Sequence, residues 1–284
     1  MKFKLNTLVA AVVLSASAMS ANAAIDANNG NSEFIFSAWD ANAGIGYTYD
    51  LNWGNFLNDF VGVDQAATTT GNALLAAGAK VKSSLIGSNG IIFDDVLTGF
   101  STANFASAAD VQWNLASYDV GGRVRLLVTE GDSGIPFATN STQVRTAATI
   151  VSAYAPASNG FIINPAEDTF AVTAQTDGNA YAGNAGSGYT DQIADTTNVL
   201  GESANLFLLA QTSLVSNTFA QPSFKQQLLA FDGRDIVAKT YLQDGQWRLQ
   251  IAAVAAVPEP ETYAMLLAGL GFIGAIARRR NKQA

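Results

Sequence analysis

The stretch DIVAKTYLQDGQWRLQIA, residues 235–252, decides the fold class. At its centre, Asp244-Gly245 favours the two-residue turn of a β-hairpin, because both positions of such a turn need positive φ. The flanking segments, Asp235 to Leu242 and Gln246 to Ala252, are rich in β-branched and aromatic residues, as is typical of strands. This part of the chain therefore predicts two antiparallel strands joined by a tight turn.

Two more hairpins are expected closer to the N-terminus. The predicted strand pairs are residues 33–39 with 45–49 and residues 111–118 with 124–129, and the apolar run 204–210 gives a further strand. In the first loop, Asp40 to Gly44, both Asn42 and Gly44 can adopt positive φ. The sequence as a whole predicts a mainly β fold, a β-sandwich-like domain with a few short helices.

Helices are expected in few places. Ser141 is suited to cap a helix over residues 142–154 that ends near Pro156. Residues 73–82 and 94–100 are further helix candidates, and the Asn-, Asp- and Gly-rich segment 161–187 is expected to form loops. The body could be one domain, or it could divide into two near residues 158–160.

The C-terminal segment has three parts in a fixed order. Val257-Pro258-Glu259-Pro260-Glu261 precedes sixteen uncharged residues, 262–277, which are followed by Arg278-Arg279-Arg280. As a helix, residues 262–277 would extend roughly 24 Å, somewhat less than a bilayer core of about 30 Å. Long cationic side chains can extend the fit, and a positive flank stays cytoplasmic. The alternative, an amphipathic core helix, is disfavoured because the segment has no polar face.

These three parts resemble the PEP-CTERM sorting signal of Gram-negative bacteria, over residues 257–284 only. The resemblance implies processing at Val257, Pro258, Glu259 and Pro260 by a membrane-embedded cysteine protease of the exosortase type, with Arg278, Arg279 and Arg280 completing the signal. It also implies an intermediate in the inner membrane and a destination at or beyond the surface of a cell that makes exopolysaccharide.

The N-terminus has the features of a secretory signal peptide. Lys2 and Lys4 precede a mostly apolar run at residues 5–14, and Ala21 and Ala23 form an A-x-A cleavage site. We expect export by the Sec machinery and cleavage after Ala23. The mature body is then residues 24–256, and the sorting tail is residues 257–284.

Composition restricts what the body can do. The chain has no cysteine and no histidine, so catalytic triads and dyads that need them are excluded, as are zinc sites built on histidine. Residues 24–256 contain 9 Lys and Arg against 21 Asp and Glu, a net charge of about −12, which argues against nucleic acid as a partner. No cofactor is indicated.

The body contains candidates for three kinds of site. Exposed Tyr47, Tyr49 and Trp53 could stack on sugars, and strand alternation would place the two tyrosines on one face. The oxygen ligands of Asp26, Asn28 and Asn31 could hold Ca²⁺, but their position in a mature N-terminus beside the signal cleavage site is the favoured explanation.

The third kind of candidate site consists of carboxylates. Adjacent Asp94 and Asp95 would point to opposite faces of a strand, which prevents them from sharing a proton. Pairs drawn from Glu130, Asp132, Glu167 and Asp168 could serve a glycosidase, if they face each other across a cleft. The sequence Gly269 to Gly274 fits G-x-G-x-x-G, but it lacks the preceding strand that a nucleotide site needs.

These observations favour a non-enzymatic exported protein of the cell surface or extracellular matrix, structural or adhesive and linked to exopolysaccharide. The alternatives are a glycan-binding module with an aromatic platform and a carboxylate-dependent glycan hydrolase.

Overall fold

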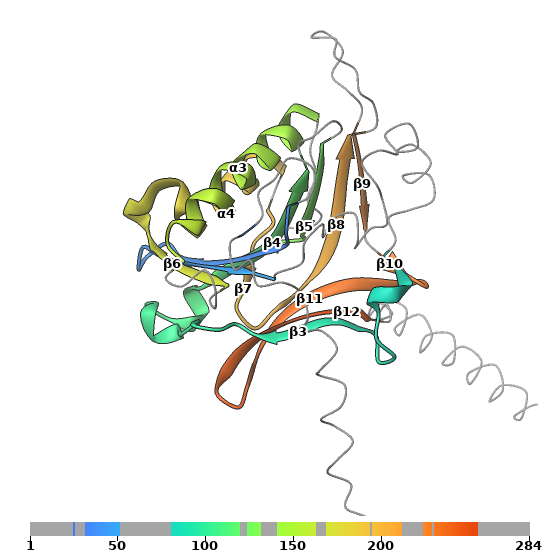
Figure 1. Ribbon diagram of the computed structural model, residues 1–284, viewed down its shortest axis with the longest axis horizontal. Helices are drawn as coiled ribbons and strands as arrows, with labels where there is room; N and C mark the ends of the chain where they lie inside the picture. The colour runs from blue at the N-terminus through green and yellow to red at the C-terminus, as the bar shows by residue number, and fades with distance from the viewer. Residues whose placement is uncertain are drawn as a thin grey trace, which may run out of the picture.

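The computed structural model describes residues 25, 32–51, 81–119, 124–131, 141–162, 169–193, 195–211, 224–228 and 230–254. In these residues the chain forms a twelve-stranded antiparallel sheet that curls back on itself, and two α-helices pack against one side of it (Figure 1). This sheet has two parts, which we call sheet A and sheet B.

Sheet A contains β1 (Ile35–Asp40), β2 (Ile45–Asp50), β4 (Gln112–Asp119), β5 (Arg125–Thr129), β6 (Phe170–Ala174), β7 (Asn198–Val199), β8 (Ser203–Gln211) and β9 (Phe224–Leu228). Sheet B contains β3 (Ile91–Val96), β10 (Ala230–Phe231), β11 (Arg234–Gln243) and β12 (Gln246–Val254). Within the described residues, the α-helices are α3 (Ser141–Asn159) and α4 (Ala182–Ile193). The same residues include the 3₁₀ helices η4 (Ser83–Leu85), η5 (Thr102–Asn104), η6 (Ala108–Asp110) and η7 (Gln175–Ala180).

Strand β8 joins the two halves. Its residues 203–205 pair with β11, and its residues 206–210 pair with β5. The strand order is therefore continuous, β3-β12-β11-β8-β5-β4-β1-β2-β6. Strands on both sides of residues 158–160 share this sheet, since β6 pairs with β2.

An inner core lies between sheets A and B. Alternate residues of the strands of both sheets point into it, for example Phe36, Trp113 and Leu208 from sheet A and Ile251 from sheet B. The rings of Phe36 and Trp113 stack with their centroids 5.7 Å apart. Aromatic and aliphatic side chains of both sheets together fill this inner core.

A second core lies between sheet A and the helices. The buried residues of α3 recur every three or four positions, so they form one apolar stripe: Val144, Ala147, Ala148, Val151, Tyr154 and Ala155. The stripe packs on the other face of sheet A, where Ile35, Leu126 and Val128 point. The molecule therefore has three layers: helices, sheet A and sheet B (Figure 1).

The prediction of a mainly β fold with few helices is confirmed, as are all three hairpins. Asp244 and Gly245 have φ of 52° and 77°, as the turn requires, and Gly44 has φ of 67°. Asn42 does not adopt positive φ.

Two predictions of local structure are wrong, and a third, the helix at residues 142–154, is confirmed as α3 except at its C-terminal end. Residues 94–100 do not form a helix: residues 91–96 are strand β3, which pairs with β12. Residues 161–187 are not only loops, because they contain β6, η7 and the start of α4. Helix α3 continues past Pro156 to Asn159. Tertiary contacts explain the last case, since Asn159 is held by two hydrogen bonds to the backbone of Ile25 (2.8 and 3.0 Å). Most of the candidate helix 73–82 falls outside the described residues.

Candidate functional site

A network of polar side chains occupies the outer face of sheet B, the face turned away from the inner core. The carboxylate of Asp94 on β3 accepts hydrogen bonds from Nε of Arg248 (2.9 Å), Nε2 of Gln250 (2.6 Å) and the hydroxyl of Tyr241 (2.8 Å). Arg248 and Gln250 lie on β12, and Tyr241 lies on β11. Three strands therefore contribute to one network.

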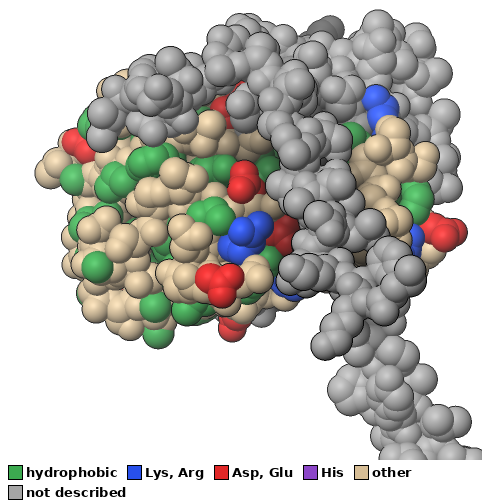
Figure 2. Space-filling model, turned by 60° about the horizontal axis from the view of Figure 1, so that its bottom comes forward, with side chains coloured by type: hydrophobic (Ala, Val, Ile, Leu, Met, Phe, Trp, Pro, Cys, Tyr) green, Lys and Arg blue, Asp and Glu red, His purple; other side chains and the backbone are tan. Residues whose placement is uncertain are grey.

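This network leaves hydrogen-bonding capacity for a ligand. Arg248 directs Nε and Nη2 at Asp94 and at the Tyr241 hydroxyl, while a guanidinium carries five N–H groups. Nζ of Lys239 lies 5.0 Å from the centre of the Tyr241 ring. The Arg248 and Asp94 side chains are 24% and 22% exposed, so water or a ligand reaches them. Figure 2 shows this side of the molecule, with basic and acidic side chains beside each other on a mostly neutral surface.

The same network shifts the pKa of Tyr241 and of Arg248. Burial raises the pKa of Tyr241, and its hydrogen bond to Asp94 raises it further. Burial lowers the pKa of Arg248, but its hydrogen bonds to Asp94 and Tyr241 outweigh this, so the pKa rises overall. At neutral pH Arg248 is therefore a cation and Tyr241 a neutral phenol.

Asp94 and Asp95 point to opposite faces of β3, as predicted. Asp94 belongs to the outer network, whereas a carboxylate oxygen of Asp95 lies 3.3 Å from the Tyr49 hydroxyl, which donates to it. A proton-sharing pair is thus ruled out for these two residues. Oε2 of Glu130 accepts a hydrogen bond from Nδ2 of Asn205 (2.7 Å), and Asp132, Glu167 and Asp168 lie outside the described residues.

The predicted aromatic platform is wrong for the two tyrosines that the structure describes. Tyr47 and Tyr49 do share a face, and their rings stack at 6.5 Å, but they are only 1% and 5% exposed. That face is the one that sheet B covers, and Phe170 and Phe100 also pack on Tyr47. Their rings belong to the inner core and are not available to a sugar. Trp53 lies outside the described residues.

The proposed calcium ligands Asp26, Asn28 and Asn31 also lie outside the described residues. Within the described part, no group of three or more His, Cys, Asp or Glu side chains is arranged to hold a metal ion.

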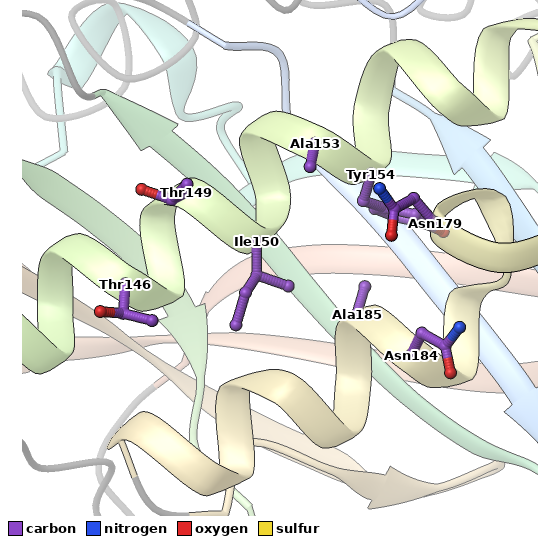
Figure 3. A pocket seen from close by; sticks show the side chains of 8 residues that line it. All are labelled: Thr146, Thr149, Ile150, Ala153, Tyr154, Asn179, Asn184 and Ala185. Carbon is purple, nitrogen blue, oxygen red and sulfur yellow. The ribbon is translucent and has the colours of Figure 1, made fainter.

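A groove of about 320 Å³ runs between α3 and α4 (Figure 3). Most of its polar side chains are already engaged with nearby backbone. The hydroxyls of Thr146 and Thr149 donate to carbonyls of α3 itself (2.9 and 2.8 Å), and Nδ2 of Asn184 donates to the carbonyl of Gly178 (2.8 Å). The Tyr154 hydroxyl is directed into sheet A, toward Ser37 and Thr48. We assign no ligand to this groove.

The signal-peptide residues Ala21 and Ala23, the box at residues 257–260 and Arg278–Arg280 lie outside the described residues. None of the helices in the described part is long and apolar enough to span a membrane.

Comparison with known families gives one match. The sequence model of the PEP-CTERM protein-sorting motif matches residues 256–281. The chain carries a PEP-CTERM sorting signal. This motif implies export, processing by an exosortase-type membrane enzyme and a location at the surface or outside the cell. For the body, no curated protein and no solved structure matches.

The sequence analysis did not predict the polar network of sheet B, although the pairing of its members on β11 and β12 follows from the sequence. Counting outward from the Asp244-Gly245 turn places Tyr241 opposite Arg248 and Lys239 opposite Gln250, as the structure shows. The pairing of β3 with β12, which brings Asp94 beside Gln250, joins residues far apart in the sequence and had no local signal.

Proposed function

We propose that this chain is a non-enzymatic exported protein of a Gram-negative cell, with a structural or adhesive role linked to exopolysaccharide. The observation that carries the proposal is the sorting motif at residues 256–281, which directly follows the β-rich body. The body would cross the inner membrane, lose residues 1–23 at the cleavage site of Ala21 and Ala23, and remain attached by residues 262–277. Processing at the box would then release it to the surface or the matrix.

The proposal is tested by the intact mass and location of the protein in a producing strain. We expect a surface or released species that lacks both residues 1–23 and the tail beyond the box. Replacing Pro258-Glu259-Pro260 with alanines should preserve export but leave uncut protein in the inner membrane. A tail retained in full on the native protein would remove the main support for a matrix role.

The outer face of sheet B favours a second candidate function, binding of glycans. Polysaccharides present hydroxyl groups and sugar faces, and the network offers matching groups: amide and guanidinium donors, a carboxylate acceptor and the Tyr241 ring. Because Asp94 already holds these side chains in place, a ligand would lose little affinity to ordering them. This face replaces the platform of Tyr47, Tyr49 and Trp53 as the region to test.

Affinity electrophoresis in gels that contain exopolysaccharide from a producing strain tests this candidate. Arg248→Ala and Tyr241→Ala should lose the retardation shown by the unmodified body. Gln246→Ala, at the exposed tip of the same hairpin, is the control and should behave as the unmodified body does. Equal retardation of all variants would exclude this face.

A carboxylate-dependent hydrolase has less support. Asp94 and Asp95 diverge, and Asn205 already engages Glu130.

A further inference from the structure

The sorting box lies very close in sequence to the folded sheet. The last described residue of β12 is Val254, and Pro258, the first proline of the box, follows after only residues 255–257. A chain spans at most about 3.6 Å per residue, so Pro258 lies within roughly 14 Å of Val254. Any enzyme that acts on the box must therefore work almost in contact with the end of sheet B.

Strand β12 is paired almost to its end. Val254 is opposite Asp235 on β11, and the N–H of Ala253 donates to the carbonyl of Gly90, just before β3 (2.9 Å). Since β12 is a central strand with a neighbour on each side, releasing further residues to the enzyme would break hydrogen bonds on both sides. Residues 255–257 are thus the only segment that separates Pro258 from the paired part of β12.

The end of sheet B has a defined surface. It consists of Val254, which is 40% exposed, the turn at residues 87–90 and the β10–β11 turn at Asp232-Gly233. The β11–β12 turn at Asp244-Gly245 lies at the opposite end of the sheet (Figure 1). Strand β12 has nine residues, so eight steps of ~3.3 Å separate its two ends by about 26 Å.

We infer that this end of sheet B is the surface that the body presents to the processing enzyme while the tail is attached. The inference rests on the proposed processing and adds an orientation: the turns at 87–90 and 232–233 face the enzyme, and the Asp244-Gly245 turn points away from it. The outer face of sheet B runs between the two ends, so it stays accessible before release.

Single-cysteine labelling tests this orientation, since the chain has no cysteine of its own. Ser88 and Gln246 are both exposed, one at each end of sheet B. The uncut full-length variants Ser88→Cys and Gln246→Cys, purified from cells without the enzyme, would be coupled to a large polyethylene-glycol maleimide. They are then mixed with membranes that contain the enzyme, and loss of the tail is followed by mass.

We expect the label at position 88 to slow tail loss severalfold and the label at position 246 to leave it unchanged. A Gly-Ser insertion between Val254 and Ala255 should restore the rate of the variant labelled at 88, because it moves the body away from the box. Equal rates for the two labelled variants would overturn the inference. The unlabelled chain in the same membranes reports processing itself, so a failure of processing is distinguished from a failure of the orientation.

Discussion

Sheets A and B are built from similar strands, but their surroundings differ. In sheet A both faces are covered: β1 directs Phe36 into the inner core and Ile35 toward the helices. In sheet B the described residues cover only one face, so β11 buries Ile236 and Ala238 and leaves Lys239 and Tyr241 partly exposed. The layer of helices accounts for this difference, and the partly exposed network around Asp94, Tyr241 and Arg248 lies on the outer face of sheet B.

Strand β8 shows the same contrast within nine residues. Where it pairs with β11, exposed Ser203, buried Ala204 and half-buried Asn205 alternate. Where it pairs with β5, residues 206–209 are all buried. A continuous apolar run in an antiparallel strand therefore marks the point at which a second layer covers it.

The largest expected effect is a cavity on the helix-facing side of sheet A. Leu126→Ala removes a fully buried side chain and should lower the free energy of unfolding by about 2–5 kcal/mol. Val237→Ala, on the partly exposed outer face of sheet B, should cost less than about 1 kcal/mol. Denaturant titration of the body measures both. Similar losses would mean that the outer face of sheet B is covered in solution.

A second prediction concerns the contact between α4 and sheet A. A Cβ at Gly186 would lie 2.1 Å from the ring of Trp39, so Gly186→Ala should destabilise the body by about 1–3 kcal/mol. Helix propensity alone predicts the opposite sign, a gain of about 1 kcal/mol. Thermal unfolding decides between them, and a raised Tm would show that α4 does not pack tightly on β1.

Removing the hydroxyl of Tyr154 or of Tyr241 allows the surroundings of the two sheets to be compared directly. Buried Tyr154 joins α3 to sheet A: Ser37 donates to its hydroxyl (3.1 Å), and Thr48 Oγ1 lies 2.5 Å from it. Tyr154→Phe leaves these partners unpaired and should cost about 1–3 kcal/mol. Tyr241→Phe, in the half-exposed network, should cost under about 1 kcal/mol because water can replace the hydroxyl. Equal costs in denaturant titration would contradict the layer model.

Asp40, at the end of β1, should make the stability of the fold depend on pH in the acid range. Burial raises the pKa of Asp40, but backbone N–H groups of Ala43, Ala106 and Asn42 donate to its carboxylate and hold the pKa below its usual value. The charged form therefore stabilises the fold fully above about pH 4, and this contribution is lost as the pH falls through the lower pKa of the folded state. Asp40→Asn should flatten this limb of a stability–pH profile. An unchanged profile would mean that other carboxylates cause the acid sensitivity.

The smallest expected effect is the ion pair on sheet B. Arg248 and Asp94 are about one-fifth to one-quarter exposed, so Asp94→Asn should change stability by less than about 1 kcal/mol, with a contribution that declines in high salt. Unfolding at low and high salt measures it. A larger, salt-independent loss of stability would show that this network mainly stabilises the fold and does not mainly form a binding surface.

The sequence predicted local pairings well and layers poorly. The Asp244-Gly245 and Asp40–Gly44 turns gave correct hairpins, because turn residues and alternation act over a few residues. The prediction of loops at residues 161–187 is wrong, because β6 and α4 contain small and polar residues that give no clear local pattern. These elements form because β6 pairs with β2 and α4 packs beside α3. Tyr47 and Tyr49 were placed on one face correctly, yet nothing local indicates that sheet B covers that face.

By itself the sequence determined the sorting tail, the mainly β class and the three hairpins, because each depends on residues adjacent in the chain. Only the tertiary structure decided which strand faces are buried, that Asp94 meets Arg248, and that the box follows within a few residues of a strand paired on both sides. These features depend on contacts between segments far apart in the sequence. The free energy of such contacts comes from burying apolar faces together, and no single segment shows which face its partner will cover.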